Sequence, residues 1–430
     1  MTDFDSVDYF QGDELIVDPY PYYDFLRQQC PVRREPHHGV VMVTGYDEAA
    51  SVFTDPDTFS SCIATTGPFP GFPVPLDGLD GDDVSDLIEQ HREELPFSDQ
   101  LPSMDPPMHK AHRGLLMRLL TPKRLRENED FMWCRADDQI DDIVARGECE
   151  LIGEFAGPFT LYVIADLLGV PEADHETFRK ELQGSRPPAG RVVGSTGSAS
   201  VSHNPLEFLY DRFTAYVEDR RRDPRDDVLT GLATATFPDG STPEVIDVVR
   251  IAANLFSAGQ ETTVRLLGSA FQLIGESPDL QQLLRDEPDR IPDFVEECLR
   301  IESPVKGDFR LARRSTTVGG VDIPAGTTVM VLNGAANRDP RRFAEPADFR
   351  IDRRNAREHL TFGRGIHACP GGPLARAEGR VAITRMLERT SDIRISEAAH
   401  GPARARRYEY VPTYILRGLR RLHLELTPAG

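Results

Sequence analysis

The sequence predicts a mainly α-helical fold with a minor β part, and three observations carry that prediction. Through the middle of the chain, apolar side chains recur at three- and four-residue spacing, which is typical of amphipathic helices. One such pattern is unusually long, from 243 to 274. Alternation with a period of two is confined to short runs near both ends. No internal repeat or clean boundary divides the chain, so we expect one domain over residues 1–430.

The expected elements follow one another along the chain. The helices, each with apolar residues on one helical face, are expected at 22–29, 109–120, 127–145, 153–168, 174–182, 243–274, 279–286, 292–301 and 372–389. The strands, short and rich in β-branched residues, are expected at 40–44, from 309, in a hairpin at 317–324, at 327–332 and after 393. Residues 339–360 are polar, rich in arginine and expected to be irregular.

The long helix has a clear predicted start and stop. Thr242 supplies a capping hydroxyl, and Pro243 suits the first helical position because it needs no N–H there. No further proline occurs before Pro278, and Gly275 is a plausible C-cap. A helix of this span is about 48 Å long, enough to cross the centre of a domain.

Two stretches lack the composition of a helix or a strand. Residues 64–104 combine proline and glycine with an acidic run, and we expect a long irregular surface segment, which is often functional. Residues 184–204 are rich in Gly, Ser and Pro and nearly free of large apolar side chains, so burial cannot offset their ordering entropy. That second segment is either a lid between helices or a plain surface connection.

Composition excludes several classes of protein. The formal net charge of −21 disfavours nucleic-acid binding through bulk electrostatics. No run of eighteen apolar residues is present, and the acidic N-terminus lacks the apolar core of a signal peptide, so we expect no membrane insertion. The six cysteines are scattered without a Cys-x-x-Cys pair, which is typical of a reducing cytoplasm rather than a disulfide framework.

The stretch 362–371 surrounds one cysteine with small and rigid residues. Glycines at 363, 365 and 371 permit tight turns and close approach to a flat ligand, and Pro370 fixes the backbone just after Cys369. Such a loop can present one thiolate as a metal ligand, and a lone cysteine is the axial ligand in haem–thiolate sites. An inert buried cysteine is the plainer alternative.

A dinucleotide-binding loop is a second alternative for the same stretch. Gly363, Gly365 and Ala368 fit that fingerprint, and Glu388 lies at the expected distance beyond it. That site needs a strand before the glycines and an unbroken helix after them. The charged residues before the loop and the Pro and Gly residues of 370–373 argue against both.

The stretch resembles the haem-binding loop of cytochromes P450, Phe-x-x-Gly-x-x-x-Cys-x-Gly. Its fixed positions are matched by Phe362, Gly365, Cys369 and Gly371. The resemblance implies the cytochrome P450 fold, with haem b (iron protoporphyrin IX) between the long helix and the Cys loop and with Cys369 on the iron.

The middle of the long helix carries a second motif. Ala258 and Thr262 lie four apart and share an apolar face, where small residues open a groove and the hydroxyl can bond its own i−4 carbonyl or a ligand. A plain helix kink is the alternative. Ala258, Gly259, Glu261, Thr262 and Thr263 resemble the P450 oxygen-binding motif. The resemblance implies that Thr262 donates a hydrogen bond to bound oxygen and that Glu261 relays protons from solvent.

Glu297 and Arg300 share a helix face at a spacing of three and can pair, although such pairs are usually solvated and contribute little to stability. They match the family's Glu-x-x-Arg, which is a buried structural pair near the thiolate. The family adds an arginine from the segment before the Cys loop. Asp348 stands where that arginine often falls, so we expect Arg350 or Arg353 to substitute.

Four basic side chains match the positions that bind haem propionates in the family. They are His109, Arg113, Arg310 and His367. Arginine suits bidentate contact with carboxylates. His109-x-x-His112 is also a weak zinc pattern, but no second ligand pair lies nearby in the sequence. The resemblance adds haem contacts from Ala258, Gly259, Phe362, Gly363 and Gly371.

The resemblance implies a soluble, cytoplasmic, monomeric monooxygenase that hydroxylates an apolar small molecule. Electrons would come from NAD(P)H through a separate reductase and a ferredoxin, because no Fe–S cysteine spacing is present in the chain. A local basic stretch is a candidate docking site for an acidic ferredoxin; it comprises Arg113, Arg118, Lys123, Arg124 and Arg126.

The pocket residues indicate a ligand such as a terpenoid, steroid or fatty acid. Those expected to form it are Leu255, Ala258, Thr262 and Val305, with Phe69 or Phe72 closing it. Lys306 hints at an acidic group on the ligand. Two other classes stay open: a peroxide-driven or isomerising haem enzyme, and a non-catalytic haem–thiolate sensor. A sensor would need Cys369 but neither Glu261 nor Thr262, so that pair favours oxygen activation.

Overall fold

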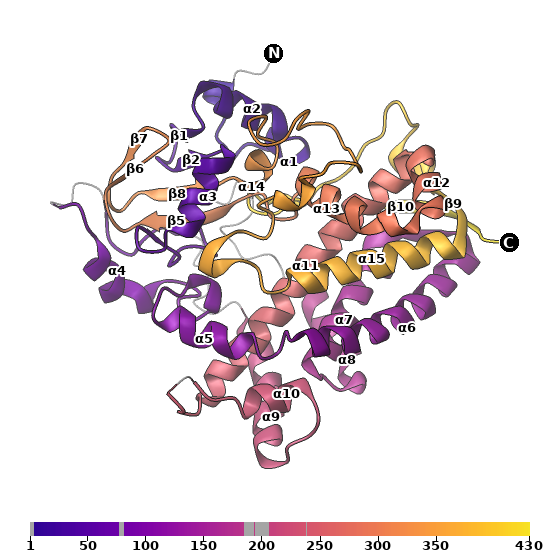
Figure 1. The fold of residues 1–430 in the computed structure, drawn as a ribbon, viewed down its shortest axis with the longest axis horizontal. Coiled ribbons are helices and arrows are strands. Elements are labelled where there is room, and N and C mark those ends of the chain that lie inside the picture. The colour runs from indigo at the N-terminus through magenta and orange to yellow at the C-terminus, as the bar shows by residue number, and fades with distance from the viewer. Residues whose placement is uncertain (1–3, 77–80, 185–192, 194–205, 238) are drawn as a thin grey trace.

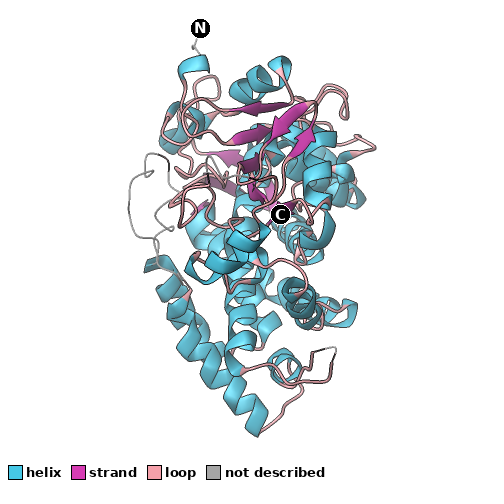
Figure 2. Cartoon of the chain, turned by 90° about the vertical axis from the view of Figure 1, so that its left-hand side faces the viewer, coloured by secondary structure: helices cyan, strands magenta, loops and turns pink. Residues whose placement is uncertain are grey.

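The architecture was determined from a computed structural model, which describes residues 4–76, 81–184, 193, 206–237 and 239–430. A β-rich part, with helices against it, adjoins a larger helical part, and one long helix runs through the middle of the molecule (Figure 1). Figure 2 shows the same arrangement from the side, with the strands gathered toward one end. The segment 184–204, predicted as a lid or a surface connection, lies almost wholly outside the described residues.

The predicted α-rich composition is confirmed. The α-helices are α1 (Glu14–Val17), α2 (Tyr20–Gln29), α3 (Tyr46–Thr54), α4 (Ser85–His91), α5 (Met108–Leu116), α6 (Pro122–Arg146), α7 (Gly157–Leu168), α8 (Glu172–Gly184), α9 (Glu207–Arg222), α10 (Val228–Ala233), α11 (Val245–Glu276), α12 (Pro278–Asp286), α13 (Ile291–Ile301), α14 (Asn333–Ala336), α15 (Gly372–Arg389) and α16 (Glu397–His400). A π-helical turn, Ile152–Ala156, leads into α7. Among the described residues, no helix pairs sufficient length with sufficient apolarity to span a bilayer.

The strands bring together segments that lie far apart in the sequence. They are β1 (Val32–Arg34), β2 (Val41–Val43), β3 (Phe59–Ser60), β4 (Glu148–Glu150), β5 (Asp308–Ala312), β6 (Thr316–Val318), β7 (Val321–Ile323), β8 (Thr328–Val331), β9 (Thr390–Ile395) and β10 (His423–Pro428). One sheet has the order β1-β2-β8-β5-β3, in which β2 and β8 run parallel. A second has the order β4-β10-β9, and β6 and β7 form the predicted hairpin.

Local signals set several helix ends. The hydroxyl of Thr121 accepts a hydrogen bond from the backbone N–H of Arg124 at 3.3 Å, and Pro122 follows at the first position of α6. Gly147 ends the same helix with φ +75°, a conformation that costs glycine little. The predicted helix 127–145 therefore began five residues late, because the cap at Thr121 and Pro122 was not recognised, whereas its predicted end lies within one residue of the observed one.

Helix α11 confirms the predicted long helix but corrects both of its ends. It begins at Val245, after Glu244, so Thr242 is not its cap. Gly275 lies inside the helix rather than after it. A Cβ atom built on Gly275 would lie 2.8 Å from Cδ1 of Ile395 on β9, so this glycine serves close packing rather than helix termination.

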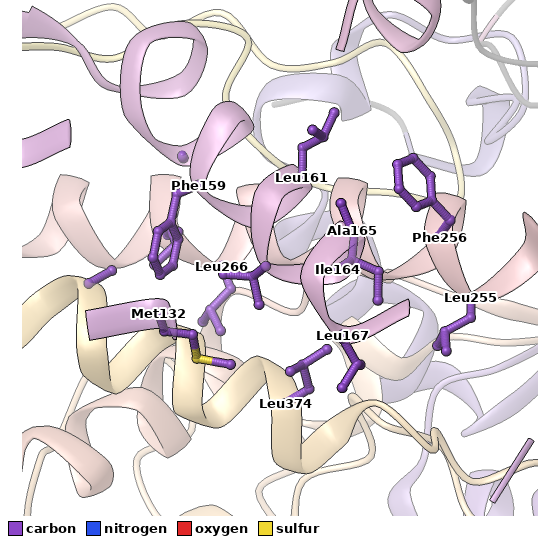
Figure 3. Close-up of a cluster of buried hydrophobic side chains, with 14 of the residues drawn as sticks. Met132, Phe159, Leu161, Ile164, Ala165, Leu167, Leu255, Phe256, Leu266 and Leu374 are labelled. Atoms are coloured by element: carbon purple, nitrogen blue, oxygen red, sulfur yellow. The ribbon is translucent and has the colours of Figure 1, made fainter. Parts of the chain in front are cut away.

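The main core lies where α6, α7, α11 and α15 meet, and side chains from all four interdigitate there (Figure 3). Gly259, in the middle of α11, permits the close approach of α7, because a Cβ atom at this position would lie 3.3 Å from Cδ1 of Ile164. The close packing of α7 therefore explains why a glycine occupies this position, although glycine destabilises an isolated helix by about 1 kcal/mol relative to alanine.

Residues 64–104 are largely irregular, as expected, but the prediction of a surface segment is wrong for much of it. The segment contains α4, and Ile88, Leu95 and Gln100 are almost completely buried. The apolar residues of this segment are separated by prolines and acidic residues, so they show no periodic pattern in the sequence, although several of them are buried in the core. The segment instead forms part of the wall of the cavity described next.

Candidate active site

A cavity of about 320 Å³ lies between α11 and the Cys loop. Most of the predicted site residues line it: His109, Arg113, Leu255, Ala258, Gly259, Thr262, Val305, Arg310, Phe362, Gly363, His367, Cys369 and Gly371. The structure therefore brings together residues from α5, α11, β5 and the Cys loop that lie far apart in the sequence, from His109 to Gly371.

The loop before α15 holds Cys369 at the cavity wall. The backbone N–H of Cys369 donates to the carbonyl of Phe362 at 2.8 Å, which closes the loop. Gly363 and Gly365 adopt φ +63° and +69°, the left-handed region that disfavours other residues. A Cβ atom at position 365 would also collide with the backbone carbonyl of Phe53. Gly371 has an ordinary φ of −82°, so it is not needed for a left-handed turn.

The thiol of Cys369 opens into the cavity but is enclosed by protein on its other sides. Burial raises its pKa, while the backbone N–H groups of Gly371 and Gly372 and the charge of Arg113 act in the opposite direction. Hydrogen bonds from the backbone and a nearby cation favour the thiolate, which is the form that binds a metal ion.

Four basic side chains converge on one side of the cavity, as predicted. The rings of His109 and His367 lie 4.1 Å apart, and burial lowers their pKa values to about 4 and about 3. Arg113 donates to the carbonyl of Ala368 at 2.5 Å, and Arg310 donates to the carbonyl of Phe309 at 2.6 Å. None of the four has a carboxylate partner within ion-pair distance among the described residues.

This arrangement fits a haem. Buried polar atoms normally have hydrogen-bond partners, yet Nε2 of both histidines has none among the described residues. A ligand with two carboxylates, such as haem with its propionates, would give these two nitrogen atoms acceptors and would give the two guanidinium groups the counter-charges that they lack. On the same wall, Cys369 presents one sulfur, the ligand set of a haem–thiolate iron.

Thr262 lies on the cavity face of α11, one turn after Ala258. Its hydroxyl donates to the carbonyl of Ala258 at 2.9 Å, which is the i−4 bond expected from the sequence. The small side chains at 258 and 259 leave room beside that hydroxyl. Thr262 can therefore offer its proton either to the helix or to a ligand in the cavity.

Glu261 points toward solvent, with 48% of its side chain exposed. Its carboxylate pairs with Arg265 one turn further along α11. Arg265 is buried, and a Cβ atom on Gly418 would lie 2.6 Å from its Cγ, so the C-terminal segment packs directly on this arginine. The acid beside Thr262 is thus held by a cation that the sequence pattern did not identify.

The Glu297–Arg300 pair is fully buried. As predicted, residues 350 and 353 supply the further contacts to Glu297 that the family takes from an arginine before the Cys loop. Arg300 donates to both carboxylate oxygens of Glu297, at 2.8 and 2.7 Å. Nε of Arg353 lies 2.9 Å from the same carboxylate, and the backbone N–H of Arg350 donates to it at 3.0 Å. Asp348 contributes only its carbonyl, at 3.0 Å from Arg300.

Three predicted pocket residues do not line the cavity. Lys306 is buried on the other side of Val305 and donates to the carbonyl of Thr413 at 2.7 Å. Burial lowers its pKa to about 7. Phe69 packs edge-on against Phe10, with ring centroids 5.5 Å apart.

Phe72 packs against His91, with ring centroids 6.0 Å apart, and not against the cavity. We therefore withdraw the expectation that either phenylalanine closes the pocket. We also withdraw the hint of an acidic ligand group, because the ammonium group of Lys306 is used within the protein.

Sequence analysis missed Glu378, a fully buried acid on α15 that lines the cavity. It is hydrogen-bonded to Thr263 of α11, and its Oε2 atom has no partner among the described residues. Burial raises its pKa to about 8. Glu378 lies four residues after Leu374 on α15, so both side chains are on the helix face that lines the cavity. That spacing was the signal available in the sequence.

We expect Glu378 to make folding stability fall as the pH rises. The folded protein keeps the proton up to about pH 8, whereas an unfolded glutamic acid loses it near its ordinary pKa of 4.5. The stabilisation is therefore complete below the lower value and is lost toward the higher one, by at most about 1.4 kcal/mol per pH unit. Urea unfolding at several pH values should show that Glu378→Gln removes this slope.

The matched control for that measurement is Glu388→Gln, which removes a carboxyl from the surface of the same helix. Its unfolding curve should keep the pH dependence of the parent protein. An unchanged slope in Glu378→Gln would show that Glu378 is not the group that holds the proton.

Comparison with known proteins agrees with this geometry. The family model described as Cytochrome P450 matches residues 204–391. "Cytochrome P450 144" of Mycobacterium tuberculosis is 32% identical over 434 residues, covering 99% of this chain and 92% of that protein. The "6-deoxyerythronolide B hydroxylase" of Saccharopolyspora erythraea is 32% identical over 386 residues, covering 88% and 90%.

The solved structures give the same result at the level of the fold. A Mycobacterium marinum cytochrome P450, CYP150A6 in its substrate-free form, superposes with a TM-score of 0.91 at 57% identity. The match covers 99% of this chain and 100% of that one, so it includes the cavity and every element around it.

Proposed function

Since this chain belongs to the cytochrome P450 family and is a haem–thiolate monooxygenase, we propose that it hydroxylates an apolar small molecule. It uses O2 and takes electrons from NAD(P)H through a separate reductase and a ferredoxin. The cofactor is haem b. The observation that carries the proposal is that Cys369 and Thr262 line one cavity, from opposite elements.

When bound, the haem supplies oxygen activation, which its thiolate ligand favours by donating electron density. The protein contributes the ligand and restrains it. Cys369 provides the sulfur, and the backbone N–H groups of Gly371 and Gly372 donate to it. His109 and His367, together with Arg113 and Arg310, would hold the carboxylates of the cofactor.

Protons reach the cavity along α11. The Glu261 side chain is half-exposed and so is in contact with water, and Thr262 presents its hydroxyl on the cavity face. Consecutive helical residues project in different directions, so the Glu261 carboxylate would have to leave Arg265 and turn toward the cavity before water could connect it to Thr262. Positioned donors of this kind are what general acid catalysis requires.

The wall of the cavity around Thr262 is apolar, which supports an apolar substrate. The aliphatic side chains there come from different elements of the fold and include Leu101, Leu116, Leu255, Leu299 and Val305. Terpenoid, steroid and fatty-acid-like skeletons are the corresponding ligand classes. Six free cysteines are consistent with the proposed cytoplasmic location.

The basic stretch at the end of α5 and the start of α6 supports docking of an acidic ferredoxin. Arg118, Lys123 and Arg126 are exposed. Lys123 lies 3.5 Å from Glu127, whereas Arg118 and Arg126 have no acidic partner within ion-pair distance in the described ranges. Unpaired cations on an otherwise acidic protein make a localised site for a partner of opposite charge.

We expect a double reversal, Arg118→Glu with Arg126→Glu, to slow ferredoxin-driven haem reduction by at least about tenfold at low ionic strength. The deficit should shrink as salt screens the parent interaction. Stopped-flow reduction measures both effects, and Arg404→Glu is the control, because it reverses another exposed arginine outside this stretch. Equal rates in the double variant and the parent would remove the docking proposal.

The proposed activity is tested by turnover of the haem-loaded protein with ferredoxin, reductase and NADPH, using apolar ligands that first give an optical binding shift. Oxygen from O2 should appear in a hydroxylated product. A ligand that binds but yields no product, with coupled reduction intact, would contradict the assignment of hydroxylation.

A further inference from the structure

We propose that Asn254 selects the substrate by binding one neutral hydroxyl or keto group on an otherwise apolar molecule. This inference rests on the proposed function and adds to it the chemistry and the placement of the recognised group. Asn254 lies on α11 and lines the cavity together with the predicted site residues. Neither the motifs nor the resemblance assigns it a role.

The position of Asn254 fixes how a ligand would lie. Asn254, Ala258 and Thr262 follow one another at intervals of four, so they occupy one face of α11, and all three line the cavity. Eight residues of α-helix rise about 12 Å. A group held by Asn254 is therefore about one helical turn beyond the small residues at 258 and 259, and remote from Thr262.

Asn254 differs from the other neutral polar residues in the cavity wall because the protein does not use its side chain. Thr65 bonds Ser103 at 3.1 Å, and Thr361 donates to the carbonyl of Leu299 at 2.6 Å. Thr262 is bonded within α11, as described above. Within the described part of the chain, the amide of Asn254 has no such partner.

A polar group that faces an apolar cavity without a partner is costly when a ligand displaces water from it. An amide can donate through Nδ2 and accept through Oδ1, so both a hydroxyl and a ketone satisfy it. A hydrocarbon of the same shape leaves it unpaired. The residue thus discriminates between ligands by penalising those that lack the group.

The charges around the cavity favour a neutral group over a carboxylate. The cations that line it, among them Arg113 and Arg310, come from α5, β5 and the Cys loop and belong with the haem carboxylates. Lys306 does not face the cavity. Asp308 does line it, bonded by Asn333 at 2.7 Å, and adds negative charge. The cation one turn before Asn254 on α11 is Arg250, which is already paired with Asp99 at 2.8 Å and so does not offset a buried carboxylate.

The test compares dodecanol, dodecane and dodecanoic acid as ligands of the haem-loaded full chain, by optical shift titration. The parent should bind the alcohol more tightly than the other two. Asn254→Leu keeps the size of the side chain and should weaken dodecanol binding about fivefold to tenfold, as expected for one lost hydrogen bond. Dodecane binding should stay unchanged or become tighter.

Gln260→Leu is the matched control, because it removes an amide from the same helix at a position that does not line the cavity. It should leave all three affinities unchanged. The products give a second readout: the parent should oxidise dodecanol toward the end remote from the hydroxyl, and Asn254→Leu should broaden that distribution.

The inference fails if Asn254→Leu changes the affinities for dodecanol and dodecane by the same factor, or if dodecanoic acid is the preferred ligand of the parent. Failure of the proposed function looks different. In that case none of the variants, nor the parent, would turn over any ligand, although haem binding and the optical titration remained measurable.

Discussion

Glu297→Ala is expected to lower the free energy of unfolding by about 3–5 kcal/mol, because it leaves buried cations without their counter-charge. Arg300 is completely buried, and only 4% of the Arg353 side chain is exposed. Both guanidinium groups bond the Glu297 carboxylate. Arg300 also donates to the carbonyls of Asn337 and Pro346, at 3.0 and 2.8 Å, which tie α13 to the irregular segment before the Cys loop.

Urea unfolding followed by circular dichroism, together with the rate of haem loss, measures this effect. The control is Glu176→Ala, which breaks a pair with Arg179 that has the same spacing but lies at the surface. That substitution should cost less than about 1 kcal/mol. If Glu297→Ala does not accumulate, Arg353→Met tests the same network from its edge, with Arg300 still paired. Losses as small as that of the control would contradict the structural role.

Thr262→Ala is expected to reduce hydroxylated product roughly a hundredfold while NADPH oxidation continues and hydrogen peroxide is released. The hydroxyl of Thr262 is the donor that α11 presents to the small-residue groove beside Ala258. Without this hydroxyl, protons are delivered only by water that the protein does not hold in place. Electrons from NADPH then reduce O2 to hydrogen peroxide, and no oxygen is transferred to the substrate. Product, NADPH and peroxide measured in the same reaction give the coupling directly.

Thr262→Ser keeps a hydroxyl at the same position and should restore most of the coupling. The optical spectrum and ligand affinity of Thr262→Ala should match those of the parent, which separates lost proton delivery from a damaged pocket. Undiminished product from Thr262→Ala that does not require NADPH would instead favour a peroxide-driven or isomerising enzyme, in which this hydroxyl has no role in oxygen activation.

Local signals predicted much of the fold and the centre of the site. The Cys loop, the groove on α11 and the end of α6 each depend on residues within about ten positions, so the sequence displays them directly. The family resemblance then supplied what spacing alone does not give, namely that Arg310 and His367 belong beside Cys369, and the structure places all three on one cavity.

Features set by distant contacts could not be predicted in this way. Val305 and Lys306 are adjacent, but consecutive residues in extended backbone point to opposite sides, so only Val305 faces the cavity. Phe69 packs on Phe10 and near Tyr414, partners that lie far away in the sequence. Gly275 resembles a helix end but accommodates Ile395, whose position depends on the pairing of β9.

Residues without a motif were missed for a different reason. Glu378 and Asn254 each occur in an otherwise ordinary helical pattern, where a polar residue is normally taken for the solvated side. Their importance appears only when the helix face is known to line a cavity. The same holds for Arg265, which looks like a surface arginine until the packing of Gly418 against it is seen.

The central claim is that sulfur from Cys369 binds the iron of a haem held between α11 and the Cys loop. The most direct measurement is the optical spectrum of the reduced, carbon monoxide-bound protein, recorded beside that of Cys369→Ser. We predict the long-wavelength absorption band of a thiolate-ligated haem in the parent and its absence from the variant. A parent protein that takes up no haem, or a variant with the same spectrum as the parent, would contradict the account.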